Sequence, residues 1–437
     1  MNQQNLKTLP HSLPFYYGWV IVLLGTVVMI MSIPGQTMGV SPLTNKLIEL
    51  LNIKRTHLTF AYLIGTLISS LFLPWVGRVL DRKGPQFMIA VSTIGLASSL
   101  MLIVATTKLV TYYNLPSWVS LIMATVFFLG IRQFGQGQMT MIGRTIIGKW
   151  FETRRGLAFG INGIFVALGF GIAPQMLHLL LSKQGFNSSL MTISASVILT
   201  GIISYIFFRD TPESCGLAME QRSKVNQQIN CEDTRQEISE VSWTATEAKK
   251  TAAFWAFNLG NVAQAMLITA VTFHIAAIAE EQGVGVDKAF SLFLPTAIIS
   301  TVGSAIGSWL SDRTSIRWHL TIMCVHLTVA LVLINYLNTV WGFYGTAFCL
   351  GISGGLFACL TAIAWPKLYG RKHLGAINGF ATSSMVFGSA LGPYIYSIFR
   401  SDSAGFSNIL LGSACFPLIL TIFSLIVPMP DKDHHRR

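Results

Sequence analysis

Long apolar runs recur along the chain, and short polar segments separate most of them. Each run reaches about 20 residues, which is enough for a helix to cross a hydrocarbon core about 30 Å thick. Because backbone polar groups in lipid must bond within their own segment, we predict helices for these runs. The predicted spans are 17–43, 57–79, 86–107, 117–146, 155–182, 188–208, 252–280, 288–311, 318–338, 340–365, 374–399 and 405–428.

One polar segment, residues 209–251, is much longer than the others. It is mixed in charge and poor in apolar residues, so it cannot bury a core of its own. We predict a linker there, in which Trp243 is either a partner contact or without a structural role. The predicted domains are an N-terminal tail at 1–16, a bundle at 17–208, the linker at 209–251, a second bundle at 252–428 and a C-terminal tail at 429–437.

The two halves repeat one another. The segment Gly77–Gly84 after the second span has a degenerate counterpart, Ser308–Arg313, after the eighth. Matched halves of six spans are typical of secondary transporters and are not needed by receptors or membrane enzymes. Further pairs are Trp150 with Trp365, Asn162 with Asn378 and Pro174 with Pro393, at offsets of 215, 216 and 219 residues.

Charge places the chain relative to the membrane. Only 11% of the residues are charged, and the net charge is +12. Of the 30 Lys and Arg residues, 22 fall on the side of the termini and the linker, 7 on the other side and one within a span. The positive-inside rule then puts both termini and the linker in the cytoplasm, and it explains the net charge without nucleic acid as a partner. We expect a plasma-membrane location, as in a bacterial inner membrane.

Aromatic residues gather near the ends of the predicted spans, where amphipathic rings prefer the membrane–water interface. We predict interfacial anchors at Tyr16, Tyr17, Trp19, Tyr112, Tyr113, Trp118, Trp318 and Trp341.

Gly77–Gly84 resembles the loop 2–3 motif of the major facilitator superfamily, G-x-L-a-D-R-x-G-R-K. It matches at Gly77, Asp81, Arg82 and Gly84, and it lacks the basic tail. The segments 16–20 (YYGWV) and 150–160 (WFETRRGLAFG) look like the oxalate/formate-antiporter and monocarboxylate-transporter branch.

This resemblance implies two six-helix bundles around a central cavity, alternating access by rocking of the bundles, and a monomer. It also implies a small organic anion as substrate. Oxalate-type members carry cations in helices 8 and 11, whereas these spans here contain no Lys or Arg between Lys288 and Arg313 or between Lys372 and Arg400. Oxalate itself is therefore disfavoured.

Arg132 is the lone charge deep within a predicted span. Such a charge costs about 2.5–3.5 kcal/mol on insertion scales, and it usually faces a cavity or a partner. A guanidinium suits a carboxylate or a phosphate bidentately, so Arg132 is a candidate substrate contact. The alternative is a structural tie to helix carbonyls. Gln136, four residues on, shares its face in an α-helix and is either a second contact or an interhelical bond.

The seventh span carries further polar residues. Asn261 and Gln264 share a face and are candidate substrate contacts. His274 is the candidate for proton coupling, because imidazole titrates near neutral pH, and its alternative is a neutral hydrogen-bonded histidine.

Charged residues at two span ends are too far from the membrane centre to touch substrate. We predict a conformational gate there, in which a charge network between the bundles forms and breaks. Its residues are Gly77, Asp81, Arg82, Asp312 and Arg313.

The chain is thus predicted to be a secondary transporter rather than an enzyme, with no cofactor or metal and with a proton or a counter-anion as possible coupling partner. No nucleotide-binding loop is present. Two alternatives stay open: an exporter of neutral or cationic compounds with the same fold, and a membrane sensor that binds without transporting.

Overall fold

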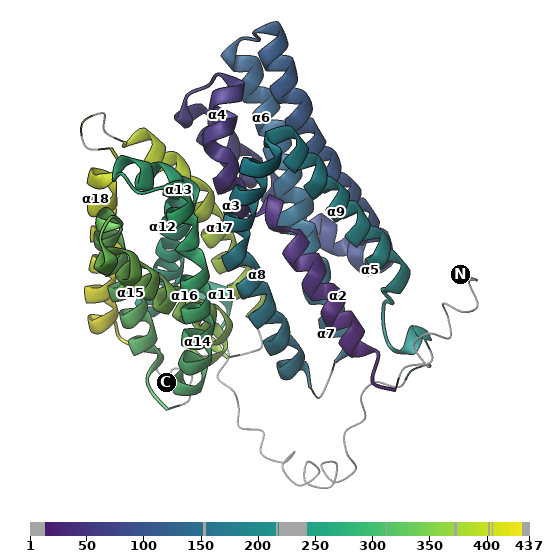
Figure 1. Cartoon of the computed structure of the whole chain (residues 1–437). Helices are drawn as coiled ribbons and strands as arrows, with labels where there is room; N and C mark the ends of the chain where they lie inside the picture. The colour runs from purple at the N-terminus through teal and green to yellow at the C-terminus, as the bar shows by residue number, and fades with distance from the viewer. Residues whose placement is uncertain are drawn as a thin grey trace. The chain divides into compact units, whose positions relative to one another are not determined.

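The computed structural model describes residues 14–151, 154–215, 217, 243–311, 313–370, 374–400, 403 and 405–430. The regular elements in these residues are helices, which confirms the predicted all-α fold (Figure 1). The chain forms two compact units, Met1–Gln236 and Glu237–Arg437.

The first span of unit 1 is not the continuous helix over 17–43 that we predict. Pro34 and Pro42 carry no N–H to donate, and a proline ring clashes with the preceding turn of a helix. The span is therefore divided. Its pieces are α2 (Gly18–Met31), η1 (Ile33–Gly35), α3 (Thr37–Val40), η2 (Ser41–Leu43) and α4 (Thr44–Leu51).

The second and third spans lie in one long element, α5 (Arg55–Tyr113), which turns at Gly84. Gly84 has φ 78° and ψ 169°, a conformation that a residue without a Cβ adopts without steric cost. Pro85 follows, and proline suits the first turn of a new helix. The glycine of the loop motif thus separates two membrane spans.

The other spans agree with the predicted ones to within a few residues at most ends. Unit 1 continues with α6 (Ser117–Ile131), η3 (Arg132–Met139), α7 (Thr140–Trp150), α8 (Arg155–Gln184) and α9 (Phe186–Phe207). Unit 2 holds α11 (Ala245–Ala248), α12 (Ala252–Glu281), α13 (Val286–Ser291), α14 (Phe293–Ser311), α15 (Ile316–Leu333), η6 (Ile334–Tyr336), α16 (Val340–Tyr369), α17 (Leu374–Ile398) and α18 (Ser407–Ile426).

Within the described residues, nine helical segments are long and apolar enough to cross a membrane. The element α5 contains two of the predicted spans, and the shorter α2 and the glycine-rich α17 supply the other two. The predicted set of twelve transmembrane helices, six in each unit, is thereby accounted for.

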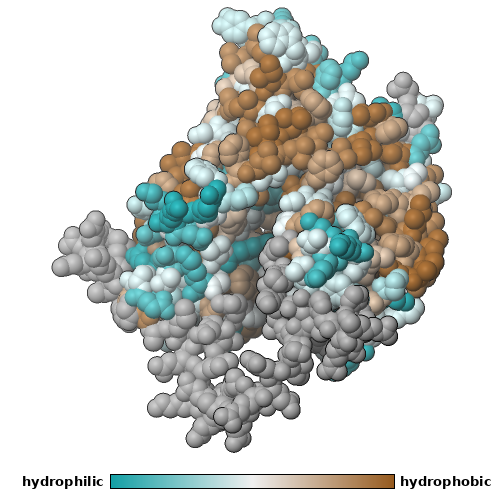
Figure 2. Space-filling view, turned by 180° about the vertical axis from the view of Figure 1, so that it is seen from behind, coloured by the Kyte–Doolittle hydropathy of each residue, from teal (hydrophilic) through white to brown (hydrophobic). Residues whose placement is uncertain are grey.

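Hydrophobic side chains form broad areas over the upper and right parts of the surface shown in Figure 2. Leu71 is 77% exposed, and Ile426 is 75% exposed. Apolar surface on this scale is not tolerated in water by a soluble monomer, and it matches the interior of a bilayer.

Two of the predicted interfacial anchors are instead part of a packed aromatic cluster in unit 1. Tyr17 is 1% exposed; its ring packs on Trp150 at 5.5 Å, and its hydroxyl donates to the Phe207 carbonyl at 2.8 Å. Tyr16 donates to the Trp150 carbonyl at 2.7 Å. The start of α2 is thus tied to the ends of α7 and α9. Trp150 and Phe151, which begin one segment of the branch resemblance, therefore contact the tyrosines that begin the other.

Trp243, for which the sequence does not decide between a partner contact and no structural role, packs against unit 2. Its ring lies 5.9 Å from that of Tyr369, and its backbone N–H donates to the Tyr369 carbonyl at 3.1 Å. The Thr251 hydroxyl lies 2.6 Å from the Tyr369 hydroxyl, and the Lys249 ammonium lies 4.0 Å from the centre of the Phe380 ring. Residues 243–251, the last part of the predicted linker, are thus packed against the ends of α16 and α17.

We expect Trp243→Ala to release this segment, because the ring is 7% exposed and packs against the Tyr369 ring. Cleavage by trypsin after Lys249 and Lys250 should become about tenfold faster, as loss of roughly 1.4 kcal/mol of local stability implies. Trp341→Ala, at a position that is 87% exposed, is the matched control and should leave the cleavage rate unchanged. Equal rates in the two variants would show that Trp243 does not hold the segment.

Candidate functional site

The fourth span changes its helical pitch at the residues that the sequence marks as functional. Residues Arg132–Met139 form a π-helix between α6 and α7. Stretches of this type are rare and are frequent at functional sites. Gly135 packs here against the broken first span. A Cβ added to Gly135 would come within 2.9 Å of the Gly35 Cα. The two backbones are therefore in direct contact.

Arg132 is buried inside unit 1, at 2% exposure. Its Nη1 donates to the Gly35 carbonyl at 3.2 Å, and that carbonyl is available because the helix breaks at η1. The buried Nε has no hydrogen-bond partner. Among the described residues, no ion pair involves Arg132. A buried cation with one unsatisfied donor can bind an anion through a charge-assisted hydrogen bond.

Two further residues of this site are not found by the sequence reasoning. The Tyr62 ring, fully buried, lies under the guanidinium with 5.0 Å from ring centre to Cζ. The Thr37 hydroxyl lies 2.7 Å from the Tyr62 hydroxyl. A ring face attracts a cation, so Tyr62 stabilises Arg132 without neutralising it. The only sequence signal for Tyr62 is one hydroxyl-bearing ring in an apolar run, which is too common to single it out.

The glutamines after Arg132 divide into two groups. Gln133 accepts from Ser69 at 3.1 Å, and Gln138 accepts from Ser92 at 2.8 Å, so both tie the π-helix to α5. Gln136 is half-buried, and its backbone carbonyl accepts from Thr140. The expected shared face of Arg132 and Gln136 rests on α-helical spacing, which a π-helix does not keep.

The polar residues of α12 in unit 2 are buried. Gln264 lies 2.5 Å from the Ser353 hydroxyl, within the packing of α12 against α16. Asn261 is fully buried, and neither its oxygen nor its nitrogen has a hydrogen-bond partner. Asn258, 1% exposed, also has an unpartnered side-chain oxygen. Buried amides without partners cost stability, so such a pair is a candidate ligand contact.

His274 is fully buried among aromatic rings. Its Nε2 lies 2.9 Å from the Pro393 carbonyl, and its ring is stacked on Tyr396 and tilted against Phe406. A carbonyl accepts only, so Nε2 carries a proton and donates. This arrangement supports the hydrogen-bonded alternative more than the coupling role.

The predicted gate residues lie at helix ends. Gly77 is half-buried, and Asp81 and Arg82 are exposed. Arg313 lies over the Trp309 ring, with 3.8 Å from Cζ to the ring centre. Asp312 lies outside the described residues. In the part of the chain that is described, no group of three or more His, Cys, Asp and Glu side chains is placed to hold a metal.

The helical architecture and the duplicated halves define a class of membrane protein. Comparison with known families identifies the family. The model of the Major Facilitator Superfamily matches residues 20–393 and, a second time, residues 298–437. The chain belongs to this superfamily. It is therefore an integral membrane protein with a transporter fold.

One curated relative and several solved structures are similar. An uncharacterized MFS-type transporter, YkuC of Bacillus subtilis (strain 168), is 23% identical over 241 residues, which are 54% of each chain. The match thus spans about half of that relative.

A bacterial homologue of the human lysosomal transporter Spinster gives a TM-score of 0.69 at 14% identity, covering 94% of this chain and 96% of that one. A bacterial homologue of the iron transporter ferroportin gives 0.67 at 13% identity, covering 97% and 99%. The xylose transporter XylE from E. coli gives 0.66 at 13% identity, covering 94% and 98%. At these identities the likeness concerns the fold alone.

Proposed function

We propose that this protein is a secondary active transporter that works by alternating access and carries a small organic anion of the monocarboxylate or dicarboxylate type. The superfamily and the duplicated six-span halves support transport. The choice of an anion rests on one observation, the state of Arg132.

Arg132 is a cation that the fold buries and does not neutralise. Its Nη1 is held by Gly35, while Nε, on the side edge of the guanidinium, has no partner. Nε and Nη2 together offer the parallel N–H pair that a carboxylate accepts bidentately. A carboxylate bound there would supply both the missing hydrogen bond and the counter-charge.

The other proposed substrate contacts are Gln136, Asn261 and Gln264. Asn261 has the strongest support, because both ends of its amide are unsatisfied. Gln264 is engaged by Ser353 and fits a supporting role. Gly77, Asp81, Arg82, Asp312 and Arg313 as a gate complete the proposal. His274 enters it in the hydrogen-bonded role, because its Nε2 donates to the Pro393 carbonyl, and not as the proton-coupling residue that the sequence suggests.

Asn261→Leu separates a structural role from a functional one. Replacing an unpartnered buried amide by an apolar group of similar size removes a desolvation cost. The free energy of unfolding should therefore rise by about 1–2 kcal/mol. Uptake should fall about tenfold if the amide binds substrate. Gln264→Leu is the comparison: it removes the amide oxygen that accepts from the Ser353 hydroxyl, which keeps only the Met323 carbonyl as acceptor, and it should lower stability. An Asn261→Leu protein that is more stable and transports normally would remove Asn261 from the site.

A second candidate, export of neutral or cationic compounds, is favoured by the Gly35 carbonyl and the Tyr62 ring, which hold Arg132 as a structural tie would. Counterflow in proteoliposomes distinguishes the two. Vesicles loaded with one unlabelled compound at a time, from carboxylates, phosphates, sugars and neutral drugs, are tested for uptake of the labelled compound. Counterflow with carboxylates alone supports the anion proposal, and counterflow with neutral or cationic compounds alone overturns it.

A further inference from the structure

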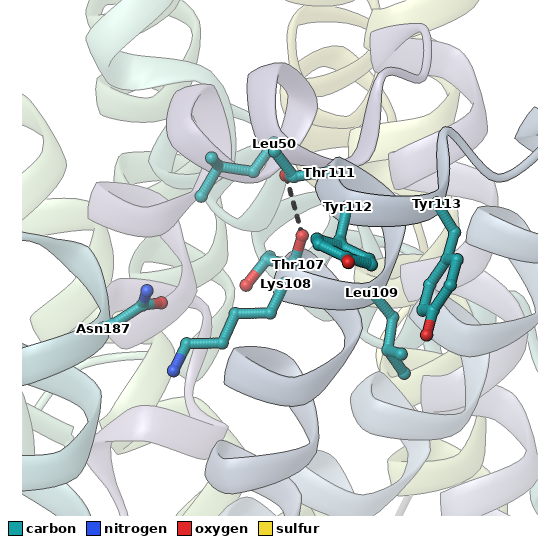
Figure 3. A pocket seen from close by; sticks show the side chains of 8 residues that line it. All are labelled: Leu50, Thr107, Lys108, Leu109, Thr111, Tyr112, Tyr113 and Asn187. Carbon is teal, nitrogen blue, oxygen red and sulfur yellow. Dashed lines mark hydrogen bonds between the residues drawn. The ribbon is translucent and has the colours of Figure 1, made fainter.

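A large pocket lies in unit 1 away from Arg132, where the second limb of α5 ends and α9 begins. Its volume is about 730 Å³. Its lining includes Lys108, Tyr112 and Tyr113 from α5, Asn187 from α9 and Leu50 from α4 (Figure 3). Tyr112 is 80% exposed and Tyr113 is 64% exposed, as expected of rings at the membrane–water interface. The pocket therefore lies at headgroup level.

Two lining groups are available to a ligand. Lys108 is exposed, no Asp or Glu lines the pocket with it, and no ion pair among the described residues involves it. The Asn187 side-chain oxygen is buried and has no hydrogen-bond donor. In Figure 3 the Lys108 ammonium and the Asn187 amide lie on the same side of the pocket, and the tyrosine rings lie on the other. A ligand that satisfies both groups needs an anionic oxygen and a separate hydrogen-bond donor.

We propose that this pocket binds a membrane phospholipid whose headgroup carries a hydrogen-bond donor beyond the phosphate, such as phosphatidylethanolamine or phosphatidylglycerol. The phosphate pairs with Lys108, and the ammonium or hydroxyl donates to the Asn187 oxygen. The acyl chains leave past Leu50 and Leu109, whose side chains line the pocket. Phosphatidylcholine has the same phosphate but no N–H or O–H, so it would leave Asn187 unsatisfied.

The test compares lipids that differ only by methyl groups. Delipidated full-length protein in detergent is titrated with dioleoyl phosphatidylethanolamine or with its trimethylated counterpart, phosphatidylcholine, and bound lipid is counted by native mass spectrometry. We expect phosphatidylethanolamine to bind about tenfold more tightly, the ratio typical of one buried hydrogen bond. Inorganic phosphate serves as a competitor: displacement of lipid by free phosphate at similar concentrations would overturn the assignment to a lipid.

Three variants locate the effect. Asn187→Leu should equalise the two lipids, and Lys108→Gln should weaken both by a similar factor. Lys183→Gln, an exposed lysine in the last turn of α8 that does not line the pocket, should change neither. Equal binding of the two lipids by the parent protein, or an unchanged ratio in Asn187→Leu, would overturn the proposal. Neither result depends on transport, so it can fail while the anion proposal stands.

Discussion

Arg132→Gln should lower carboxylate uptake by about 100-fold, because it removes a charge-assisted interaction of about 3 kcal/mol with the substrate. The same change should leave the folded protein at least as stable as the parent. One hydrogen bond to Gly35 and the contact with the Tyr62 ring are lost, while the cost of holding a cation inside the membrane, about 2.5–3.5 kcal/mol on insertion scales, is removed. Uptake into proteoliposomes and thermal unfolding of the same preparation measure both quantities.

Two further variants sharpen this experiment. Arg132→Lys keeps the charge but not the planar pair of donors, so it should restore only part of the uptake. Arg144→Gln, at an exposed position on the same span, is the matched control and should transport normally. An Arg132→Gln protein that takes up carboxylates at the parent rate would refute the anion site. One that is strongly destabilised would make Arg132 a structural tie.

The spans were predictable because each requires only a local property, an apolar run long enough for the bilayer. The same locality explains the wrong prediction for the first span. Composition alone reads 17–43 as one apolar run, whereas Pro34 and Pro42 act through the backbone and divide it. That division exposes the Gly35 carbonyl to Arg132. The break therefore contributes to the site and is not merely a departure from regularity.

Within the candidate site, only residues that are unusual in their own stretch of sequence could be predicted. Arg132 stands out because it is one cation in an apolar run, and in the structure it is buried. Tyr62 and Thr37 belong to the site through contacts between residues that are distant in sequence. Residue spacing within one helix cannot predict contacts of α3 and α5 with η3. The tyrosines at positions 16 and 17 show the same limit. They look like interface anchors from their place at a span end, but the packing of α7 and α9 buries Tyr17.

Gly35→Ala should destabilise the protein by about 2 kcal/mol or more, since overpacking that backbone must absorb usually costs 1–3 kcal/mol. A Cβ at Gly35 would meet the Gln136 nitrogen at 2.7 Å and the Gly135 Cα at 2.9 Å. These are backbone atoms of the π-helix, and no side chain can rotate away to make room. The first and fourth spans would separate, and the Gly35 carbonyl would move from Arg132. Thermal unfolding should therefore shift to lower temperature, and uptake should fall with it.

The reciprocal change and a matched control identify the cause. Gly135→Ala should destabilise similarly, because its Cβ would meet the Gly35 Cα at 2.9 Å. Gly148→Ala, on the same fourth span, would meet only the Phe159 ring at 3.7 Å, an ordinary contact, and alanine is the better helix former. It should be neutral or slightly stabilising. If Gly35→Ala matches Gly148→Ala in stability, the close contact of the two spans is not what holds Gly35 beside Arg132. Gly35→Ala should lower the stability of the protein, whereas Arg132→Gln should retain it. That difference would show that Gly35 holds the two spans together, while Arg132 binds the substrate.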